Sequence, residues 1–265
     1  YREHNWVYDK LKIAQLQGLD CAPHGIAPGN YPVFSKPIMN LHGMGAGSAR
    51  LDSADDYETN YQPGHMWMEM LTGRHVSTDV AVEAGIPAGG GMFDYWTITA
   101  DREVGIEAAT ADFIVRHLAD FTGMINLETI GDRIIEMHLR ITDQWPDAYG
   151  GSSWIDALKR LFATGRWTFA DDDRRSAFSV ALFGALDGRY RHPPARLIDE
   201  LRANAGVSSV QTTFREDRSN HWHANPPGGF RLAVVNGFDL AACKAVRRRL
   251  ATFHGLDRII NDTET

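Results

Sequence analysis

Residues 124–140 of the chain read M-I-N-L-E-T-I-G-D-R-I-I-E-M-H-L-R. Apolar and polar side chains alternate on both sides of Gly131 and Asp132, which is typical of two β-strands joined by a tight turn. A strand has a period of two, so Met137 and Leu139 lie on one face of the second strand and the polar residues around them on the other. The stretch therefore predicts a hairpin with one apolar and one polar face.

The polar face of this hairpin carries Glu136, His138 and Arg140 on its second strand. Glu128 lies on the first strand, close enough across the hairpin to join them. Two carboxylates, an imidazole and a guanidinium make a poor protein core. They suit divalent metal and phosphate, because Mg²⁺ takes oxygen ligands and a guanidinium binds phosphate oxygens. The hairpin is the first indication of an enzyme that uses ATP.

The composition is that of an ordinary globular protein. The 265 residues, 43% hydrophobic and 23% charged, allow one large or two smaller domains. The net charge of −7 argues against nucleic acid as a partner, and the basic run at residues 247–249 is interpreted as the solvated face of a helix. No apolar run approaches the roughly 18 residues that span a bilayer, so no membrane partner is expected. Cys21 and Cys243 cannot form a disulfide framework, which indicates a cytoplasmic location.

The first 170 residues predict alternating helices, strands and loops. A helical pattern covers residues 5–18 and ends at Gly18, and a strand at 31–37 leads to a glycine-rich loop at 42–48. Strands at 66–71 and 75–82 are expected to pair around a turn at Thr72 and Gly73. The glycines at 89–91 are expected to break the chain before residues 92–100. A short acidic helix from residue 52 and helices at 106–121 and 154–163 complete this part.

Beyond residue 170 the character of the sequence changes. A charged connector at 171–175 precedes strand patterns at 178–183, 207–214 and 230–235 and helical patterns at 194–203 and 240–253. We expect a small α+β module here, with a domain boundary between residues 170 and 171. His221 and His223 could bind a metal, but two histidines without a nearby acidic pattern favour a polar loop.

Lys36 ends a strand beside the glycine-rich loop. A lysine there is a point charge that can meet nucleotide phosphates, and the small loop residues let backbone N–H groups approach them. The alternative is a surface lysine before a mobile loop. The acidic hairpin downstream favours the phosphate role. The loop residues included in the expected nucleotide site are Gly43, Gly45, Gly47 and Ser48.

Four features in this order resemble the ATP-grasp superfamily. They are the segment Asp9-Lys10-Leu11-Lys12, the strand that ends at Lys36-Pro37 before the glycine loop, the segment Met68-Glu69-Met70-Leu71-Thr72-Gly73, and the acidic hairpin. The acid, the Ile-Gly-Asp turn and the Glu-x-Asn-like motif are similar to those of bacterial glutathione synthetases. The resemblance covers roughly residues 5–145. It implies an α+β, two-subdomain nucleotide-binding fold over residues 1–170, with the small module at 171–265.

The resemblance also implies how the nucleotide binds. Lys36 takes a phosphate role, and either Lys10 or Lys12 is the second nucleotide lysine; the solvated face of a helix is the alternative for either one. Residues 68–71, with Glu69 and Leu71 in the binding set, look like the segment that holds adenine. His75 stands where relatives often place a glutamate that holds the ribose.

In the acidic hairpin, Glu128 and Glu136 are the metal pair by resemblance. His138 replaces the usual asparagine. Imidazole binds Mn²⁺ or Zn²⁺ readily, whereas Mg²⁺ prefers oxygen. His138 therefore has one of three roles. It lies behind the metal ligands, or it shifts the metal preference of the site, or it indicates that catalytic activity has been lost. Arg140 would stabilise charge on a transferred phosphoryl group. A surface ion-pair ladder is the alternative for the whole face.

We expect a ligase that uses ATP with Mg²⁺ or Mn²⁺ to join a small-molecule carboxylate to an amine through an acyl phosphate. A nucleotide-binding or regulatory module without ligase activity, and a kinase on the same scaffold, are the alternatives. Relatives carry a domain ahead of the first lysine helix, whereas this chain begins at Tyr1. We therefore expect a truncated chain, a minimal version, or a homo-oligomer or partner chain that supplies that domain.

Overall fold

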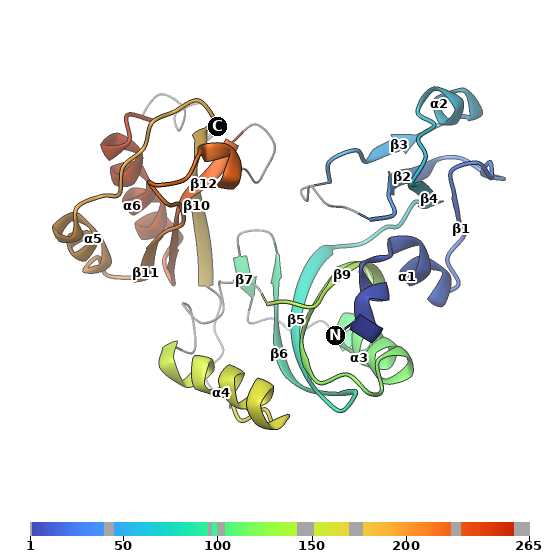
Figure 1. Ribbon diagram of the computed structural model, residues 1–265, viewed down its shortest axis with the longest axis horizontal. Coiled ribbons are helices and arrows are strands. Elements are labelled where there is room, and N and C mark those ends of the chain that lie inside the picture. The colour runs from blue at the N-terminus through green and yellow to red at the C-terminus, as the bar shows by residue number, and fades with distance from the viewer. Residues whose placement is uncertain are drawn as a thin grey trace. The chain divides into compact units, whose positions relative to one another are not determined.

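The computed structural model describes residues 2–39, 45–94, 97–99, 104–141, 151–169, 177–223 and 229–256 (Figure 1). Two compact units make up the chain. Unit 1 consists of Tyr1–Asp94, Asp101–Thr142 and Asp156–Asp171, and unit 2 of Tyr95–Ala100, Asp143–Ile155 and Asp172–Thr265. Within the described ranges, no helix is long and apolar enough to cross a membrane.

The chain starts with two short helices, where the sequence predicted one helix over residues 5–18. A 3₁₀ helix, η1 (Arg2–Tyr8), precedes the α-helix α1 (Lys10–Leu16). The division falls at Asp9, whose extended backbone and side chain cap the α-helix by accepting a hydrogen bond from Lys12 N at 2.9 Å. The chain turns away at Gly18, which has a φ of +70°, a conformation that glycine adopts easily.

Four antiparallel strands form a small sheet in unit 1. Their order is β1 (Cys21–Pro23), β4 (His65–Glu69), β2 (Val33–Pro37) and β3 (Ala49–Leu51). One face packs an apolar cluster against α2 (Ala54–Thr59), the predicted acidic helix, which Ser53 caps. Strand β2 is shorter than the predicted 31–37 and includes Lys36 near its end.

The predicted hairpin of residues 66–71 and 75–82 is wrong. Strand β4 pairs with β1 and β2, whereas β5 (His75–Glu83) pairs with β6 and β8 in another sheet. Both strands have neighbours on both edges, so neither has a free edge for the other. Residues 70–74 are instead a linker between the two sheets of unit 1. Within this linker Gly73 has a φ of +128°.

The second sheet of unit 1 places β6 (Ile86–Asp94), β5, β8 (Gly123–Ile130) and β9 (Arg133–His138) side by side and antiparallel. Its core lies against α3 (Val104–His117), with Phe113, Ile114, Ile125 and Leu127 among the buried residues. The glycines at 89–91 do not break the chain, because they lie inside β6 and pair with residues 79–81 of β5. A ladder needs only backbone N–H and C=O groups, so glycine does not prevent pairing.

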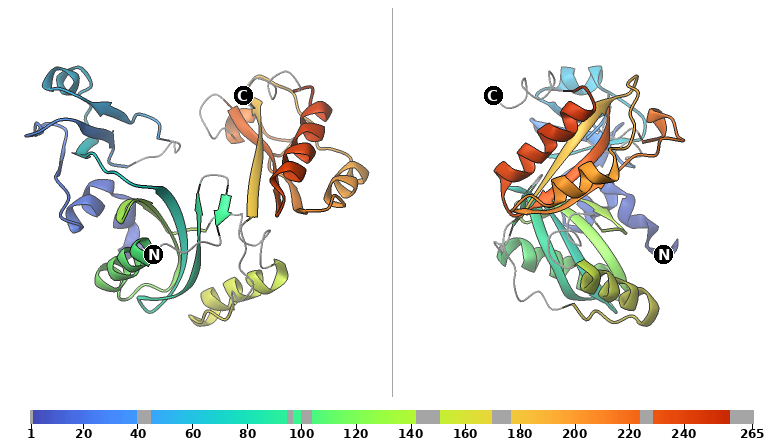
Figure 2. Two further views of the ribbon diagram at one scale, coloured as in Figure 1. Left: turned by 180° about the vertical axis from the view of Figure 1, so that it is seen from behind. Right: turned by 90° about the vertical axis from the view of Figure 1, so that its left-hand side faces the viewer.

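Unit 2 is built on strands β11 (Val207–Thr212), β12 (Gly229–Gly237), β10 (Ala177–Ala185) and β7 (Thr97–Thr99), in that order. Helix α6 (Leu240–Phe253) packs on β10 and β12, and α5 (Ala195–Arg202) on β11 (Figure 2). A 3₁₀ helix, η3 (Asn220–His223), follows β11. The predicted strands and helices between residues 178 and 253 are confirmed. The helix predicted at 154–163 is α4 (Gly151–Thr164), and the connector at 171–175 lies outside the described residues.

Candidate functional site

The predicted acidic hairpin is present in β8 and β9. Glu128 pairs with Glu136 and Asn126 with His138, so these four side chains share one face of the sheet. The turn falls at Gly131, whose φ is +59°, and at Asp132. The Cβ that an alanine would place at Gly131 lies 2.9 Å from Thr72 O, so the turn touches the linker.

Glu128, Glu136 and His138 each offer one ligand atom, and these atoms all lie within 4.8 Å of one another. We call these three residues the acidic cluster. His138 Nε2 lies 3.2 Å from Glu136 Oε1, and His75 Nε2 lies 3.2 Å from Glu128 Oε2. Among the residues that the structure describes, no other three His, Cys, Asp or Glu side chains come together in this way.

Two buried lysines approach this cluster from different elements. Lys10 at the start of α1 places its ammonium 3.0 Å from Glu136 Oε2. Lys36 on β2 donates a hydrogen bond of 2.9 Å to Ile135 O, beside Glu136. Each lysine is 5% exposed. Lys12, by contrast, is exposed and lies over the Trp6 ring at 4.9 Å, so only Lys10 of the two candidates reaches the cluster.

Burial and neighbouring charges act on the protonation of this site. Burial, reinforced by the Lys10 charge, lowers the pKa of Lys36 to about 8, although Glu136 and Glu128 oppose the change. Burial raises the pKa of Glu136, but the His138 hydrogen bond and the nearby Lys10 ammonium outweigh it and lower the pKa to about 2. Glu136 is therefore a carboxylate at neutral pH, and the site brings opposite charges close together.

The acidic cluster fits a divalent cation. Two carboxylates supply the oxygen ligands that Mg²⁺ and Mn²⁺ take, and the imidazole supplies a nitrogen that Mn²⁺ and Zn²⁺ accept more readily than Mg²⁺. The two glutamates are half-buried, with 27% and 20% of their side chains exposed. Their oxygens therefore remain accessible to an ion from solution.

An apolar cluster, which we call the apolar wall, lies on the same side of the small sheet as Lys36. Ala14, Met66 and Met68 are buried, and Phe34, Leu71 and Ile135 pack against them. Ligand sites for planar bases are lined by such groups. Leu71 thus belongs to this apolar wall. Glu69 is exposed, and its backbone N–H donates to Asp20 O at 2.9 Å while its carboxylate accepts from Asp20 N at 3.0 Å.

The described part of the glycine-rich loop is a turn that leads into β3. Ser48 N donates to Gly45 O at 2.9 Å. Gly45 and Gly47 have φ values of +67° and +80°, and a Cβ at Gly47 would lie 3.3 Å from His65 Nε2. This turn therefore runs close to His65, the first residue of β4. Gly43 and residues 40–44 around it lie outside the described part of the chain.

Arg140 is exposed and lies beyond the end of β9. Its Nη1 donates to Ile141 O at 3.4 Å, and within the described part of the chain no hydrogen bond or ion pair joins it to the acidic cluster. Its role in phosphoryl transfer stays a prediction. His221 is exposed on η3, and the side chain of His223 lies outside the described part, so their metal role is not supported.

Sequence reasoning missed a buried polar group on the same sheet face. Asn126 is 1% exposed, and its amide nitrogen donates to Ser77 Oγ and to Asp79 Oδ1, each at 2.9 Å. Asp79 is also 1% exposed. The sequence could have indicated Asn126, because it stands two residues before Glu128. Side chains two residues apart on a strand lie on the same face.

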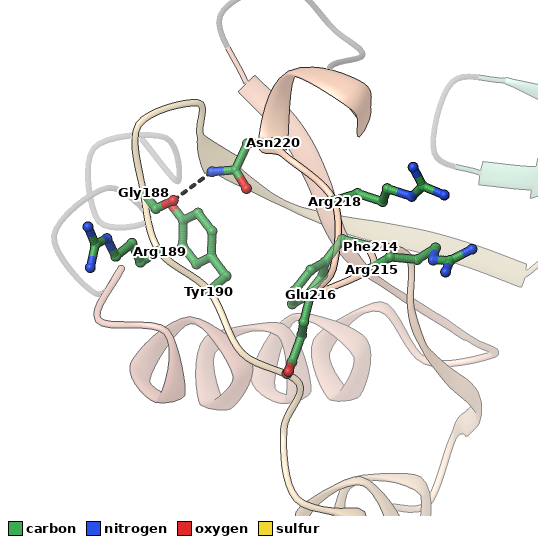
Figure 3. Close-up of a pocket in the computed structure, with 8 residues that line it drawn as sticks. All are labelled: Gly188, Arg189, Tyr190, Phe214, Arg215, Glu216, Arg218 and Asn220. Carbon is green, nitrogen blue, oxygen red and sulfur yellow. Dashed lines mark hydrogen bonds between the residues drawn. The ribbon is translucent and has the colours of Figure 1, made fainter.

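Unit 2 contains a separate open pocket of about 190 Å³ (Figure 3). Arg215 makes two hydrogen bonds to Asp217, at 2.9 and 2.7 Å. Figure 3 shows Arg215 and Arg218 extending to one side and Arg189 to the other, so the guanidinium groups do not converge. None of the residues predicted to form the site lines this pocket. The lining residues are Gly188, Arg189, Tyr190, Phe214, Arg215, Glu216, Arg218 and Asn220.

No protein-family model matches the sequence, and no curated protein is significantly similar to it in sequence. Solved structures do match the fold. The L-amino acid ligase of Bacillus licheniformis is 15% identical, with a TM-score of 0.57, and the match covers 92% of this chain and 69% of that one. N5-carboxyaminoimidazole ribonucleotide synthetase of Thermotoga maritima is 13% identical, with a TM-score of 0.64 and coverages of 94% and 72%.

A third match is the biotin carboxylase domain of the Hydrogenobacter thermophilus 2-oxoglutarate carboxylase, solved with MgADP, ADP and bicarbonate. It is 14% identical, with a TM-score of 0.57, and the match covers 90% of this chain and 63% of that one. These proteins are ATP-grasp enzymes, and at such low identity the likeness concerns the fold. The chain therefore has an ATP-grasp fold of the α+β class, as its sequence predicted.

Proposed function

We propose that this chain is an ATP-dependent ligase that joins a small-molecule carboxylate to an amine through an acyl phosphate. The observation that carries the proposal is the meeting of Lys10, Lys36 and the acidic cluster at one place on an ATP-grasp fold. Buried ammonium groups beside accessible carboxylates suit a ligand that carries both phosphate and a divalent cation.

In this proposal each group has a defined part. Lys10 and Lys36 bind phosphate oxygens, and the turn at Gly45, Gly47 and Ser48 offers backbone N–H groups to them. The apolar wall that includes Leu71 receives adenine, Glu69 lies beside it, and His75 holds the ribose. Glu128, Glu136 and His138 would hold Mg²⁺ or Mn²⁺, which neutralises phosphate charge when it is bound.

The reaction has two steps. An oxygen of the carboxylate substrate attacks the γ-phosphorus of ATP, the bond to the bridging oxygen breaks, and ADP leaves with its electron pair. The amine nitrogen then attacks the acyl carbon, phosphate leaves, and the nitrogen loses a proton to give the amide. The lysines and Arg140 would stabilise charge that develops on the transferred phosphoryl group.

The names of the matched structures support the proposal. One is an L-amino acid ligase, and others were solved with ATP, ADP or MgADP. The chain spans 63–74% of the length of these structures, so both substrates and any partner chain or oligomer belong to the proposal. We include a cytoplasmic location, because Cys21 and Cys243 are free thiols.

Hydroxylamine provides a direct test, because it converts an acyl phosphate into a stable hydroxamate. The chain would be incubated with MgATP, hydroxylamine and a mixture of L-amino acids or other carboxylates, and both ADP and hydroxamate would be measured. We expect both products in equal amounts, and neither from Glu136→Gln. ADP without hydroxamate would indicate a kinase, since the phosphoryl group then goes to another acceptor.

The second candidate is a nucleotide-binding module without turnover. His138 favours it, because its nitrogen occupies a place in the cluster where an oxygen ligand would suit Mg²⁺ better. Calorimetry with ATP separates the two. Nucleotide binding without ADP formation in Mg²⁺, Mn²⁺ and Zn²⁺ would support the module and contradict the ligase.

A further inference from the structure

The amide of Asn126 is held from one side only. Its nitrogen uses both hydrogens, one toward Ser77 Oγ and one toward Asp79 Oδ1, each at 2.9 Å. Its oxygen, Oδ1, is buried and has no hydrogen-bond partner within the described residues. A buried amide oxygen without a partner is costly, and such groups in native proteins call for an explanation.

The order of the strands constrains the direction of Asn126 Oδ1. Strand β8 lies between β5 and β9, and both acceptors of the Asn126 amide lie on β5. An amide is planar, so a nitrogen turned toward β5 leaves the oxygen turned away from β5. On β9 the residue paired with Asn126 is His138, a member of the acidic cluster. Paired residues of antiparallel strands share a face and have neighbouring side chains.

Asp79 and Ser77 also affect the chemistry of the oxygen. A carboxylate that accepts a hydrogen bond from the amide nitrogen draws the proton away and increases the negative charge on the amide oxygen. Hydrogen-bonded groups behind a metal ligand commonly fix its orientation in this way. Ser77 and Asp79 therefore hold the Asn126 amide as residues behind a metal ligand hold an oxygen ligand in place.

We propose that Asn126 Oδ1 is a further oxygen ligand of the divalent cation held by the acidic cluster, and that Ser77 and Asp79 keep it in place. The inference rests on the proposed function, which puts a cation there. A third oxygen beside Glu128 and Glu136 counteracts the nitrogen of His138. The site then favours Mg²⁺ and Mn²⁺ over Zn²⁺, because Mg²⁺ demands oxygen whereas Zn²⁺ accepts nitrogen.

The test is metal binding, measured without turnover. Mn²⁺ is titrated into the chain in the presence of ADP and followed by electron paramagnetic resonance, with competition by Mg²⁺ and Zn²⁺. We expect Asn126→Leu, which removes the oxygen, to weaken Mn²⁺ binding by about 10-fold or more and to reduce the preference for Mg²⁺ over Zn²⁺.

A second variant distinguishes loss of the oxygen ligand from loss of the fold. The exchange Asn126→Asp with Asp79→Asn keeps one amide and one carboxylate in contact and puts a charged oxygen at position 126. It should bind Mn²⁺ at least as tightly as the unmodified chain, and thermal unfolding checks both proteins. Unchanged Mn²⁺ affinity and metal preference in Asn126→Leu would overturn the inference, as would equal losses in both variants.

The same titration separates this inference from the proposed function. Glu136→Gln should lose Mn²⁺ binding if the acidic cluster holds the cation. If Glu136→Gln binds Mn²⁺ normally, the metal site of the proposed function is wrong. If Glu136→Gln fails to bind and Asn126→Leu binds normally, the cluster holds the cation without Asn126.

Discussion

The ammonium of Lys10 lies 3.0 Å from Glu136 Oε2, and this contact joins the first turn of α1 to strand β9. Lys10 is 5% exposed, so the pair has little access to water. A buried lysine needs such a partner, because an unpaired buried charge is strongly destabilising. The contact also fixes which of the two N-terminal lysines faces the proposed phosphate site.

Lys10 and Lys12 form a matched pair for the first prediction. We expect Lys10→Met to weaken ATP binding by about 10- to 100-fold, the effect of losing a hydrogen bond to a charged group. Lys12→Met should change it less than about 2-fold, because Lys12 lies over Trp6 and is exposed. Calorimetry with a non-hydrolysable ATP analogue measures both. Equal effects would remove Lys10 from the phosphate site.

The second prediction concerns the stability cost of Lys36. Its pKa of about 8 in the folded chain lies below the 10.5 of an unperturbed lysine. The unfolded chain therefore binds the proton more tightly, and the charge destabilises the fold at neutral pH. We expect Lys36→Met to increase the free energy of unfolding at pH 7 by on the order of 1–2 kcal/mol, after the lost hydrogen bond to Ile135 O is included.

The pH dependence has a definite sign. The cost of Lys36 is complete below about pH 8 and disappears as the pH rises to about 10.5, so the difference between Lys36→Met and the unmodified chain should shrink over that window. Urea unfolding of both proteins at several pH values measures it. A difference that stays constant with pH would show that packing, and not the charge, is responsible. Lys36→Met should also lose ATP binding despite its greater stability.

The third prediction is a change of metal preference at His138. Replacing His138 with Asn exchanges a nitrogen donor for an oxygen donor of smaller size. We expect ATP turnover with Mg²⁺ to rise relative to turnover with Zn²⁺ by about 10-fold, because Mg²⁺ prefers oxygen. His221→Asn, which changes an exposed histidine of unit 2, is the control and should leave this ratio unchanged. An unchanged ratio in His138→Asn would exclude His138 from the metal ligands.

The fourth prediction uses two glycines. A Cβ at Gly73 would lie 2.7 Å from Gly131 Cα, and Gly73 has a φ of +128°, which side-chain-bearing residues rarely adopt. Gly73→Ala should therefore destabilise unit 1 by about 2 kcal/mol or more. Gly29→Ala meets nothing within 4 Å and should stay within about 0.5 kcal/mol. Urea unfolding compares them, and similar effects would argue against the close contact.

Local patterns in the sequence were enough to predict the acidic hairpin and the strands and helices β10, α5, β11, β12 and α6 of unit 2. Alternation over Glu128 to His138 depends only on neighbouring residues, and it places the acidic cluster correctly on one face. The resemblance of four ordered motifs to the ATP-grasp superfamily implied the fold that is found. The functional roles of the individual site residues stay predictions.

Features that depend on distant partners were predicted wrongly or missed. Strands β4 and β5 are adjacent in sequence, but they pair with other strands in two different sheets. The local sequence pattern does not determine these pairings. The selection of Lys10 over Lys12 depends on Glu136, far along the chain. Asn126 is informative only once Ser77 and Asp79 are known to lie on the strand beside it.

The contact between the linker and the hairpin turn has a thermodynamic consequence. Gly73 lies against Gly131, and Gly131 N donates to Arg74 O at 2.9 Å, so the segment next to the apolar wall and the strands of the acidic cluster share a backbone junction. Coupling between two binding sites is reciprocal. If the proposed adenine and cation sites are both on this chain, each ligand must change the affinity for the other by the same factor, and the glycine pair is where the two segments meet.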